Sequence, residues 1–196
     1  MAFRAPDLFF SGLATHFAPE ASLASLVADV TSGDISSRAK VEAMLERFNS
    51  APAALSNLQD NAAVIDVCFG GSAGGAEAVL ERLAEAAKSG SAFAKATLAS
   101  MLTKSPTSLK ATHKQLTAPD RLDLESALRM EYRVCMRICD TNDYQEGVRA
   151  LGWETKKSKP PPNWQPPSLA DVKDSEHVDW LFAKFENAAD ELNVHV

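Results

Sequence analysis

The sequence predicts a mainly α-helical fold with one short strand near the N-terminus. After Pro19, apolar residues recur at helical spacing in one segment after another. Glycine and proline interrupt these segments, as they do between helices. Only the stretch from Phe9 to Glu20 looks like a strand. The predicted chain is therefore nearly all helix.

The strand-like stretch reads FFSGLATHFAPE, from Phe9 to Glu20. A lone strand cannot satisfy its own backbone N–H and C=O groups. We therefore expect the rest of its sheet in another chain or in a segment that this sequence does not contain.

The helical segments follow in order, and the fifth has the clearest start. Ser105 is a ready N-cap, and Pro106 stands at the first helical position, where its missing N–H costs nothing. After the Pro-rich stretch KKSKPPPNWQPPS, which must be extended, a terminal helix is expected over 175–192. The expected helices before this terminal one show apolar residues at helical spacing. They cover residues 20–30, 36–48, 76–88, 92–104, 105–116, 122–139 and 142–151.

Composition excludes several classes of protein. The chain has 196 residues, enough for a real core, and a net charge of −6. No apolar run is long enough to cross a bilayer, and an acidic chain is a poor match for a phosphate backbone. The opening residues fit neither a secretory signal nor an Arg- and Ser-rich transit peptide. We therefore expect no membrane and no direct nucleic-acid partner.

The three cysteines are Cys68, Cys135 and Cys139. An odd number without regular spacing is no disulfide framework. Cys135 and Cys139 lie one helical turn apart, but no histidine stands nearby to complete a metal site. We expect all three to be small apolar residues packed on helices.

A glycine-rich stretch, GGSAGG at 70–75, raises the question of a phosphate-binding loop. It lacks the G-x-G-x-x-G spacing and the Lys-Ser/Thr ending. The preceding residues fit a helix, with Val64, Ile65 and Cys68 on one face. A turn between two helices is the better interpretation.

Glu131 interrupts the apolar stripe of the longest predicted helix. A carboxylate there needs a partner. It either acts as an acid or base or anchors helix packing, and the second role is favoured, with Arg149 as a guessed partner. Arg129, Arg133 and Arg137 lie one turn apart, so we expect acidic neighbours or a bound anion beside them, unless the face is simply solvated. The four histidines have no matching nucleophile and no i, i+4 pair, so no triad is predicted.

Six motifs in fixed order resemble the C-terminal half of the 3-hydroxyisobutyryl-CoA hydrolases, a family of the crotonase (enoyl-CoA hydratase/isomerase) superfamily. They are GLATHF (12–17), CF (68–69), SPTSLKAT (105–112), EYR (131–133), EGVRA (146–150) and P-x-W-x-P (162–166). SPTSLK and EGVRA around EYR are the specific ones. The fold class is thus expected to be the helical C-terminal part of a crotonase-like fold, with one N-terminal strand whose sheet is missing.

The resemblance implies a division of the chain. Residues 1–19 would be the last strand of a crotonase core, 20–104 a family-type helical insert, 105–152 the C-terminal crotonase helices, and 153–196 a Pro-rich segment and a terminal helix. It also implies that the oxyanion hole and the catalytic acidic residues lie upstream of this sequence. No catalytic, cofactor-binding or metal-binding residue is therefore nominated.

The implied chemistry is hydrolysis of a short branched 3-hydroxyacyl-CoA thioester in valine breakdown, in the mitochondrion, with no cofactor besides the CoA of the substrate. The isolated chain is expected to be inactive, and its expected partners are the acyl-CoA, reached through the missing core, and further copies or a split-protein partner. Two alternatives stay open: a non-catalytic helical interaction module, for example in a mitochondrial ribosome, and hydratase or isomerase activity.

A basic cluster of three lysines departs from the family pattern. After EGVRA the chain runs LGWETKKSKPPPNW, and Lys156, Lys157 and Lys159 offer point charges to CoA phosphates. A solvated turn is the favoured interpretation.

Overall fold

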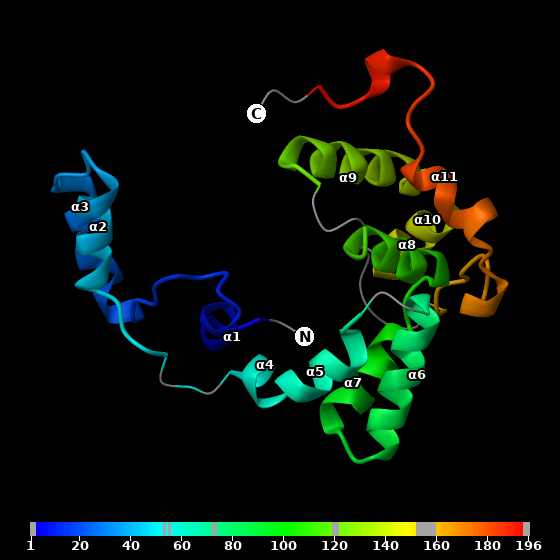
Figure 1. Ribbon diagram of the computed structural model, residues 1–196, viewed down its shortest axis with the longest axis horizontal. Helices are drawn as coiled ribbons and strands as arrows, with labels where there is room; N and C mark the ends of the chain where they lie inside the picture. The colour runs from blue at the N-terminus through cyan, green and yellow to red at the C-terminus, as the bar shows by residue number, and fades with distance from the viewer. Residues whose placement is uncertain are drawn as a thin grey trace. The chain divides into compact units, whose positions relative to one another are not determined.

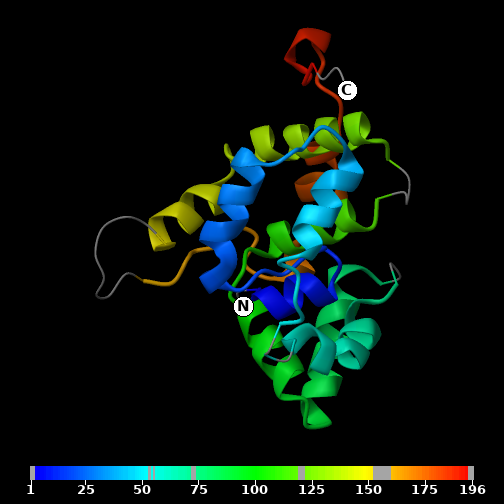
Figure 2. The same cartoon turned by 90° about the vertical axis from the view of Figure 1, so that its left-hand side faces the viewer.

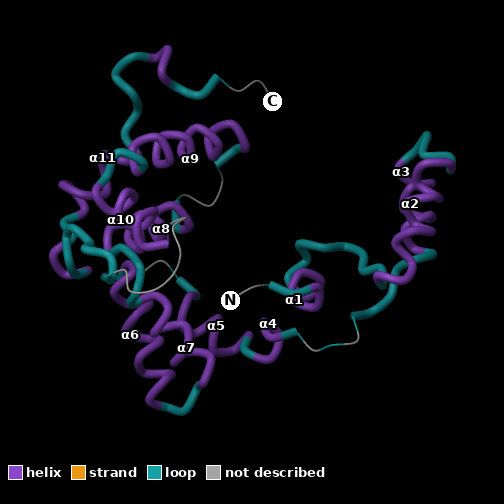
Figure 3. Tube along the Cα trace, turned by 180° about the vertical axis from the view of Figure 1, so that it is seen from behind, coloured by secondary structure: helices purple, strands orange, loops and turns teal. Residues whose placement is uncertain are grey.

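The computed structural model describes residues 3–52, 54, 56–71, 74–118, 122–151 and 160–193. Over these ranges the chain is helical or irregular and contains no strand (Figure 3). The prediction of a mainly α chain is confirmed. Two compact units, Met1–Val67 and Cys68–Val196, make up the chain, and each is described by itself.

The predicted strand over Phe9–Glu20 is wrong. Helix α1 (Ala5–Phe10) takes up the first two residues of that stretch. Pro6 lies in its first turn, and the Asp7 carboxylate accepts a hydrogen bond from the Arg4 N–H (3.1 Å). Proline and a carboxylate at these positions favour a helix start.

The rest of that stretch begins with a turn, in which Gly12 has φ +74°, continues as irregular backbone and pairs with no strand among the described residues. The Phe17 N–H donates to the side-chain oxygen of Asn49 (3.0 Å), and the Phe17 carbonyl accepts from the Ser50 N–H (2.9 Å). His16 lies 3.2 Å from Glu46 of the neighbouring helix. Contacts with α3 (Arg38–Glu46) and the residues after it thus take the place of the hydrogen bonds of a sheet.

Asp7 joins α1 to α4 (Asn57–Asp60). Its carboxylate is almost fully buried and accepts hydrogen bonds from the Leu58 N–H and the Ser56 hydroxyl, both at 3.0 Å. The backbone N–H groups of Leu58 and then of Arg4 lower the pKa of Asp7. Asp7 therefore caps two helices at once.

Helices α2 (Leu23–Ser32) and α3 (Arg38–Glu46) complete the first unit. Arg47 donates to Asp29 across the pair (2.8 Å). Met44 is the buried apolar side chain of α3, whereas α2 buries none of its residues. This unit thus has little core of its own among the described residues.

The second unit begins at the end of α5 (Ala62–Phe69), which the predicted glycine turn connects to α6 (Gly75–Lys88). Gly74 precedes α6 with φ +85°, a conformation that favours glycine, in agreement with a turn between two helices; residues 72 and 73 of the predicted turn lie outside the described residues. Cys68 and Leu83 are fully buried here.

Helix α7 (Ala92–Met101) packs beside α6 as a hairpin (Figures 1 and 2). Helix α8 (Pro106–Leu116) contacts α6 in turn. Lys110 of α8 forms an ion pair with Glu77 of α6 (2.8 Å) and donates to the Val172 carbonyl (2.8 Å). This lysine ties three segments of the unit together.

Helices α9 (Leu124–Ile138) and α10 (Asn142–Leu151) follow, and α11 (Asp179–Phe182) packs on α9. The core of this part is made by buried apolar side chains from four segments, namely Ala111, Val134, Val172, Val178 and Leu181. None of the helices in the described ranges has the length and apolar composition needed to span a bilayer.

The predicted terminal helix over 175–192 is much shorter in the structure. A π-helical turn (Asp174–Val178) leads into α11, and the backbone becomes extended at Ala183. The Arg137 guanidinium of α9 donates to the carbonyls of Leu181 and Ala183. These carbonyls therefore bind an arginine in place of the N–H groups of another helical turn.

Candidate functional site

Three segments of the second unit surround a cavity of ≈ 990 Å³. The start of α8 contributes Ser105 and Ser108, and α10 contributes Tyr144, Gly147 and Val148, among others. The Pro-rich segment closes a third side with Pro162 and Trp164. The SPTSLK, EGVRA and P-x-W-x-P motifs, far apart in the sequence, thus meet at one place.

Ser105 fixes the first wall. Its hydroxyl accepts a hydrogen bond from the Ser108 N–H (3.1 Å), as predicted for an N-cap, and Pro106 follows at the first helical position. The same hydroxyl donates to the Asp143 carboxylate at 2.5 Å. Both side chains are nearly fully buried.

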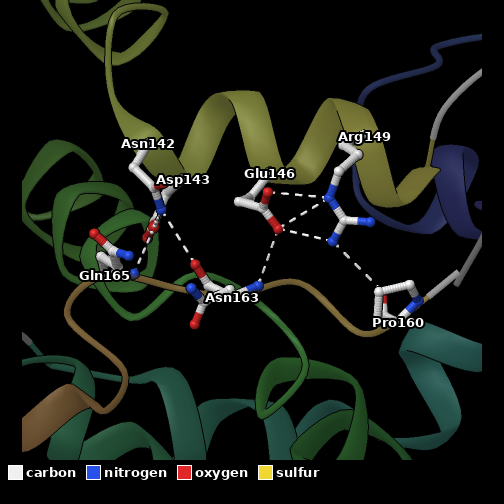
Figure 4. A network of polar contacts seen from close by, with 7 residues as sticks. All are labelled: Asn142, Asp143, Glu146, Arg149, Pro160, Asn163 and Gln165. Atoms are coloured by element: carbon white, nitrogen blue, oxygen red, sulfur yellow. Dashed lines mark hydrogen bonds and ion pairs between the residues drawn. The ribbon is translucent and has the colours of Figure 1, made fainter.

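Asp143 of α10 joins α8, through Ser105, to the Pro-rich segment, and Figure 4 shows its contacts with Asn142 and Gln165. Besides the Ser105 hydroxyl, its carboxylate accepts the backbone N–H of Gln165 (2.7 Å) and the side-chain amide of Asn142 (3.3 Å). Asn142 also donates to the Asn163 carbonyl (3.1 Å). A buried carboxylate with several donors is satisfied, so Asp143 positions segments and is not free to act as a base.

Glu146 forms a second anchor one turn along α10 (Figure 4). It pairs with Arg149 (2.7 Å) and accepts the Asn163 N–H (3.1 Å). Arg149 also donates to the Pro160 carbonyl (3.5 Å). The Arg149 guanidinium, followed by the Asn163 N–H, lowers the pKa of Glu146 to about 2. Glu146 is therefore ionised throughout the neutral range.

Trp164 lies between these two anchors and forms an aromatic wall. Its indole N–H donates to the Thr103 carbonyl (3.3 Å), which fixes the ring. A Cβ added at Gly147 would lie 3.7 Å from the ring, which is ordinary van der Waals contact. The helix and the ring therefore pack closely at this glycine. Tyr144 and Val148 of α10 line the same cavity and remain 47% and 55% exposed. Large apolar side chains left open in this way are typical of a binding surface.

The cavity is suited to binding an apolar group and not to catalysis by itself. Asp143, the carboxylate in its wall, is already saturated with donors. Within the described ranges, no three His, Cys, Asp or Glu residues come together to hold a metal ion. What remains is a concave surface with apolar side chains, hydroxyl groups and the cationic side chain of Lys104, and such a mixture is common in small-molecule sites.

Comparison with known proteins identifies the family. The sequence profile described as enoyl-CoA hydratase/isomerase matches residues 2–182, nearly the whole chain. The chain belongs to the enoyl-CoA hydratase/isomerase family. The crotonase resemblance seen in the motifs is confirmed, and members of this family bind acyl-CoA substrates.

Relatives within the enoyl-CoA hydratase/isomerase family include three proteins named 3-hydroxyisobutyryl-CoA hydrolase, mitochondrial. That of Danio rerio is 32% identical over 89% of this chain, that of Xenopus laevis 33% over 90%, and that of Homo sapiens 31% over 87%. The chain spans 43–44% of the length of these relatives. A solved carnitinyl-CoA dehydratase from Mycobacterium thermoresistibile is similar at a TM-score of 0.75 and 26% identity, over 94% of this chain and 48% of that one.

Glu131 is not a buried acid or base in this family member. It is exposed on α9 and accepts a hydrogen bond from the Gln115 side chain (3.3 Å). The guess that Arg149 is its partner is wrong, since Arg149 pairs with Glu146. Glu131 lies beside the apolar stripe of the helix and reaches solvent.

The α9 arginines meet the expected acidic neighbours in two of three cases. Arg129 pairs with Glu125 (2.5 Å), and Arg133 pairs with Glu191 (2.8 Å). The third, Arg137, binds backbone carbonyls and lies over the ring of Phe185 (4.5 Å). All three therefore stabilise the fold, and two of them hold the C-terminal segment on α9.

The remaining sequence predictions concern the three cysteines and the three lysines after α10. Cys68 is buried as expected, but Cys135 is exposed, so its prediction as a packed residue is wrong. Cys139 is half-buried. Lys156, Lys157 and Lys159 lie outside the described residues.

Sequence reasoning missed Asp143 and Gly147 as parts of the site. Asp143 contacts Ser105 from 38 positions away, and no local pattern shows that distance. The available signal was the EGVRA motif itself, whose glycine faces the tryptophan of P-x-W-x-P.

Proposed function

We propose that this chain is the helical part of an acyl-CoA thioester hydrolase and that its cavity holds part of the acyl-CoA. The substrate proposed first is 3-hydroxyisobutyryl-CoA, in valine breakdown in the mitochondrion. One observation carries the proposal: the three motifs that resemble those of the hydrolases converge on one cavity of ≈ 990 Å³. Similarity to relatives named hydrolases supports the reaction type.

The reaction needs more than this cavity offers. Thioester hydrolysis requires donors for the developing oxyanion and a carboxylate that positions or activates water. Asp143 in the cavity wall is committed to Ser105 and Gln165. We therefore propose that the 196-residue chain is inactive alone and acts with a crotonase core, supplied in the same polypeptide or by a partner.

A chimera tests this proposal. This chain would replace the matching 174 residues of the human hydrolase, and release of free CoA from 3-hydroxyisobutyryl-CoA would be followed with a thiol reagent. We expect hydrolysis well above that of the truncated human protein and none from this chain alone. A folded chimera no more active than the truncated protein would contradict the proposal, as would turnover by the isolated chain at the rate of the human enzyme.

Hydration or dehydration is a second candidate, and the similarity to the carnitinyl-CoA dehydratase favours it. The same chain grafted onto the dehydratase core separates the two. Activity recovered with the dehydratase core, but not with the hydrolase core, would favour this candidate.

A helical interaction module is a candidate of a different class. It is favoured by the exposed apolar residues of α2, which include Val27 at 59% and Leu23 at 45% exposure. A stable, monodisperse homo-oligomer that binds no acyl-CoA would support the module over the hydrolase.

A further inference from the structure

The cavity is large for a short acyl group. Its volume of ≈ 990 Å³ is at the upper end of the range of roughly 300–1,000 Å³ that suits a whole drug-sized ligand. A four-carbon hydroxyacyl group fills a small fraction of such a space. A short acyl group would therefore leave most of the apolar walls exposed to water, which is unfavourable.

The walls are apolar along one continuous side. Val148 and Tyr144 of α10 face the cavity together with Trp164 and Pro162 of the Pro-rich segment. Covering them removes apolar surface from water, which favours binding in proportion to the area covered. Of the polar lining residues, Ser105 and Asp143 already bond to each other and need no polar ligand group, and Lys104 supplies the one cationic side chain among the described lining residues.

Hydrogen bonds on both sides of Trp164 fix its position in the cavity wall. Gln165 N–H is held by Asp143 (2.7 Å) and Asn163 N–H by Glu146 (3.1 Å), so the residues before and after the tryptophan are both anchored to α10. Its indole N–H is held by the Thr103 carbonyl. Trp164 is thus a fixed wall, and Gly147 lies so near it that an added Cβ would contact the ring at 3.7 Å, so a side chain larger than alanine there must extend into the cavity or displace the ring.

From this geometry we propose that the site accepts acyl groups longer than 3-hydroxyisobutyryl, of medium length such as octanoyl, and that Trp164 and Gly147 set this preference. The inference rests on the proposed function in that the ligand is an acyl-CoA. The apolar chain lies along Val148 and Trp164 and excludes water from both.

Calorimetric titration of the purified 196-residue chain tests it, with CoA, butyryl-CoA, hexanoyl-CoA and octanoyl-CoA as ligands. Each methylene that becomes fully buried strengthens binding about fourfold. Because this cavity is open on one side, we expect a gain of at least about tenfold from butyryl-CoA to octanoyl-CoA.

Variants locate the effect. Trp164→Ala removes the wall and is expected to lower the affinity for octanoyl-CoA about tenfold while leaving that for free CoA unchanged. Trp180→Ala is the matched control, since Trp180 belongs to the same unit but does not line this cavity. Gly147→Leu places a larger side chain on the α10 side of the cavity, and it should weaken the binding of octanoyl-CoA far more than the binding of butyryl-CoA.

Each outcome decides between the proposals. Equal affinity for CoA, butyryl-CoA and octanoyl-CoA overturns the acyl-chain inference and leaves the proposed function standing. If the gain in affinity from butyryl-CoA to octanoyl-CoA is the same in folded Trp164→Ala and Gly147→Leu as in the unmodified chain, the role of these two residues is overturned. Failure of the folded chain to bind any acyl-CoA overturns the proposed acyl-CoA site itself.

Discussion

Replacing Asp143 by alanine is the perturbation with the largest effect that the site predicts. The side chain is 6% exposed and accepts hydrogen bonds from the Ser105 hydroxyl and the Gln165 N–H at 2.5 and 2.7 Å. Hydrogen bonds to a charged group contribute about 1.5–3 kcal/mol each, and a buried donor left unpaired costs about 1–3 kcal/mol. The Ser105 hydroxyl can rotate and still accepts from Ser108, so we expect Asp143→Ala to lower the free energy of unfolding by about 3 kcal/mol.

Urea unfolding followed by tryptophan fluorescence measures this loss selectively. The chain has three tryptophans, Trp153, Trp164 and Trp180, and all belong to the second unit. Asp140→Ala, an exposed aspartate just before α10, is the matched control and should change stability by less than about 0.5 kcal/mol. An Asp143→Ala variant as stable as the Asp140→Ala control would refute the anchoring role.

Three further predictions concern α10 and the cysteines. Gly147→Ala should raise stability by about 1 kcal/mol in the same assay, because alanine favours a helix interior and its Cβ meets the Trp164 ring at ordinary contact distance; a loss would show that the ring lies closer. The pKa of Glu146 is lowered from 4.5 to about 2, so its contribution is fully present above pH 4.5 and is lost as the pH falls through about 2. Glu146→Gln should therefore flatten the acid limb of the stability profile, and an unchanged profile would contradict the ion pair. In alkylation followed by mass spectrometry, exposed Cys135 should react first and buried Cys68 only on unfolding; early labelling of Cys68 would contradict its burial.

Local patterns predicted most helices of this chain correctly. Apolar spacing identified α2, α3 and α5 to α10 but not the short α4, and Ser105 with Pro106 marked the start of α8. These features depend on neighbours within a few residues, which the sequence displays directly. The ordered motifs, in turn, led to the right family.

Two predicted elements, the N-terminal strand and the long terminal helix, are wrong because contacts between residues far apart in the chain decide these segments. The strand at Phe9–Glu20 was predicted from composition, but Pro6 and Asp7 begin a helix, and Asp7 is fixed by Ser56 far along the chain. The terminal helix ends early, where the Arg137 guanidinium donates hydrogen bonds to the carbonyls of Leu181 and Ala183. Such bonds join residues tens of positions apart, so no periodicity reveals them.

The proposed function requires that the SPTSLK, EGVRA and P-x-W-x-P segments form one acyl-CoA site. A titration of the isotope-labelled chain with 3-hydroxyisobutyryl-CoA, followed by amide NMR spectra, tests it most directly. We predict that the shifted signals cluster at the backbone N–H groups of Gly147 and Val148 and at the indole N–H of Trp164. Signals that do not move at saturating ligand, or that move only in residues away from these three segments, would contradict the claim.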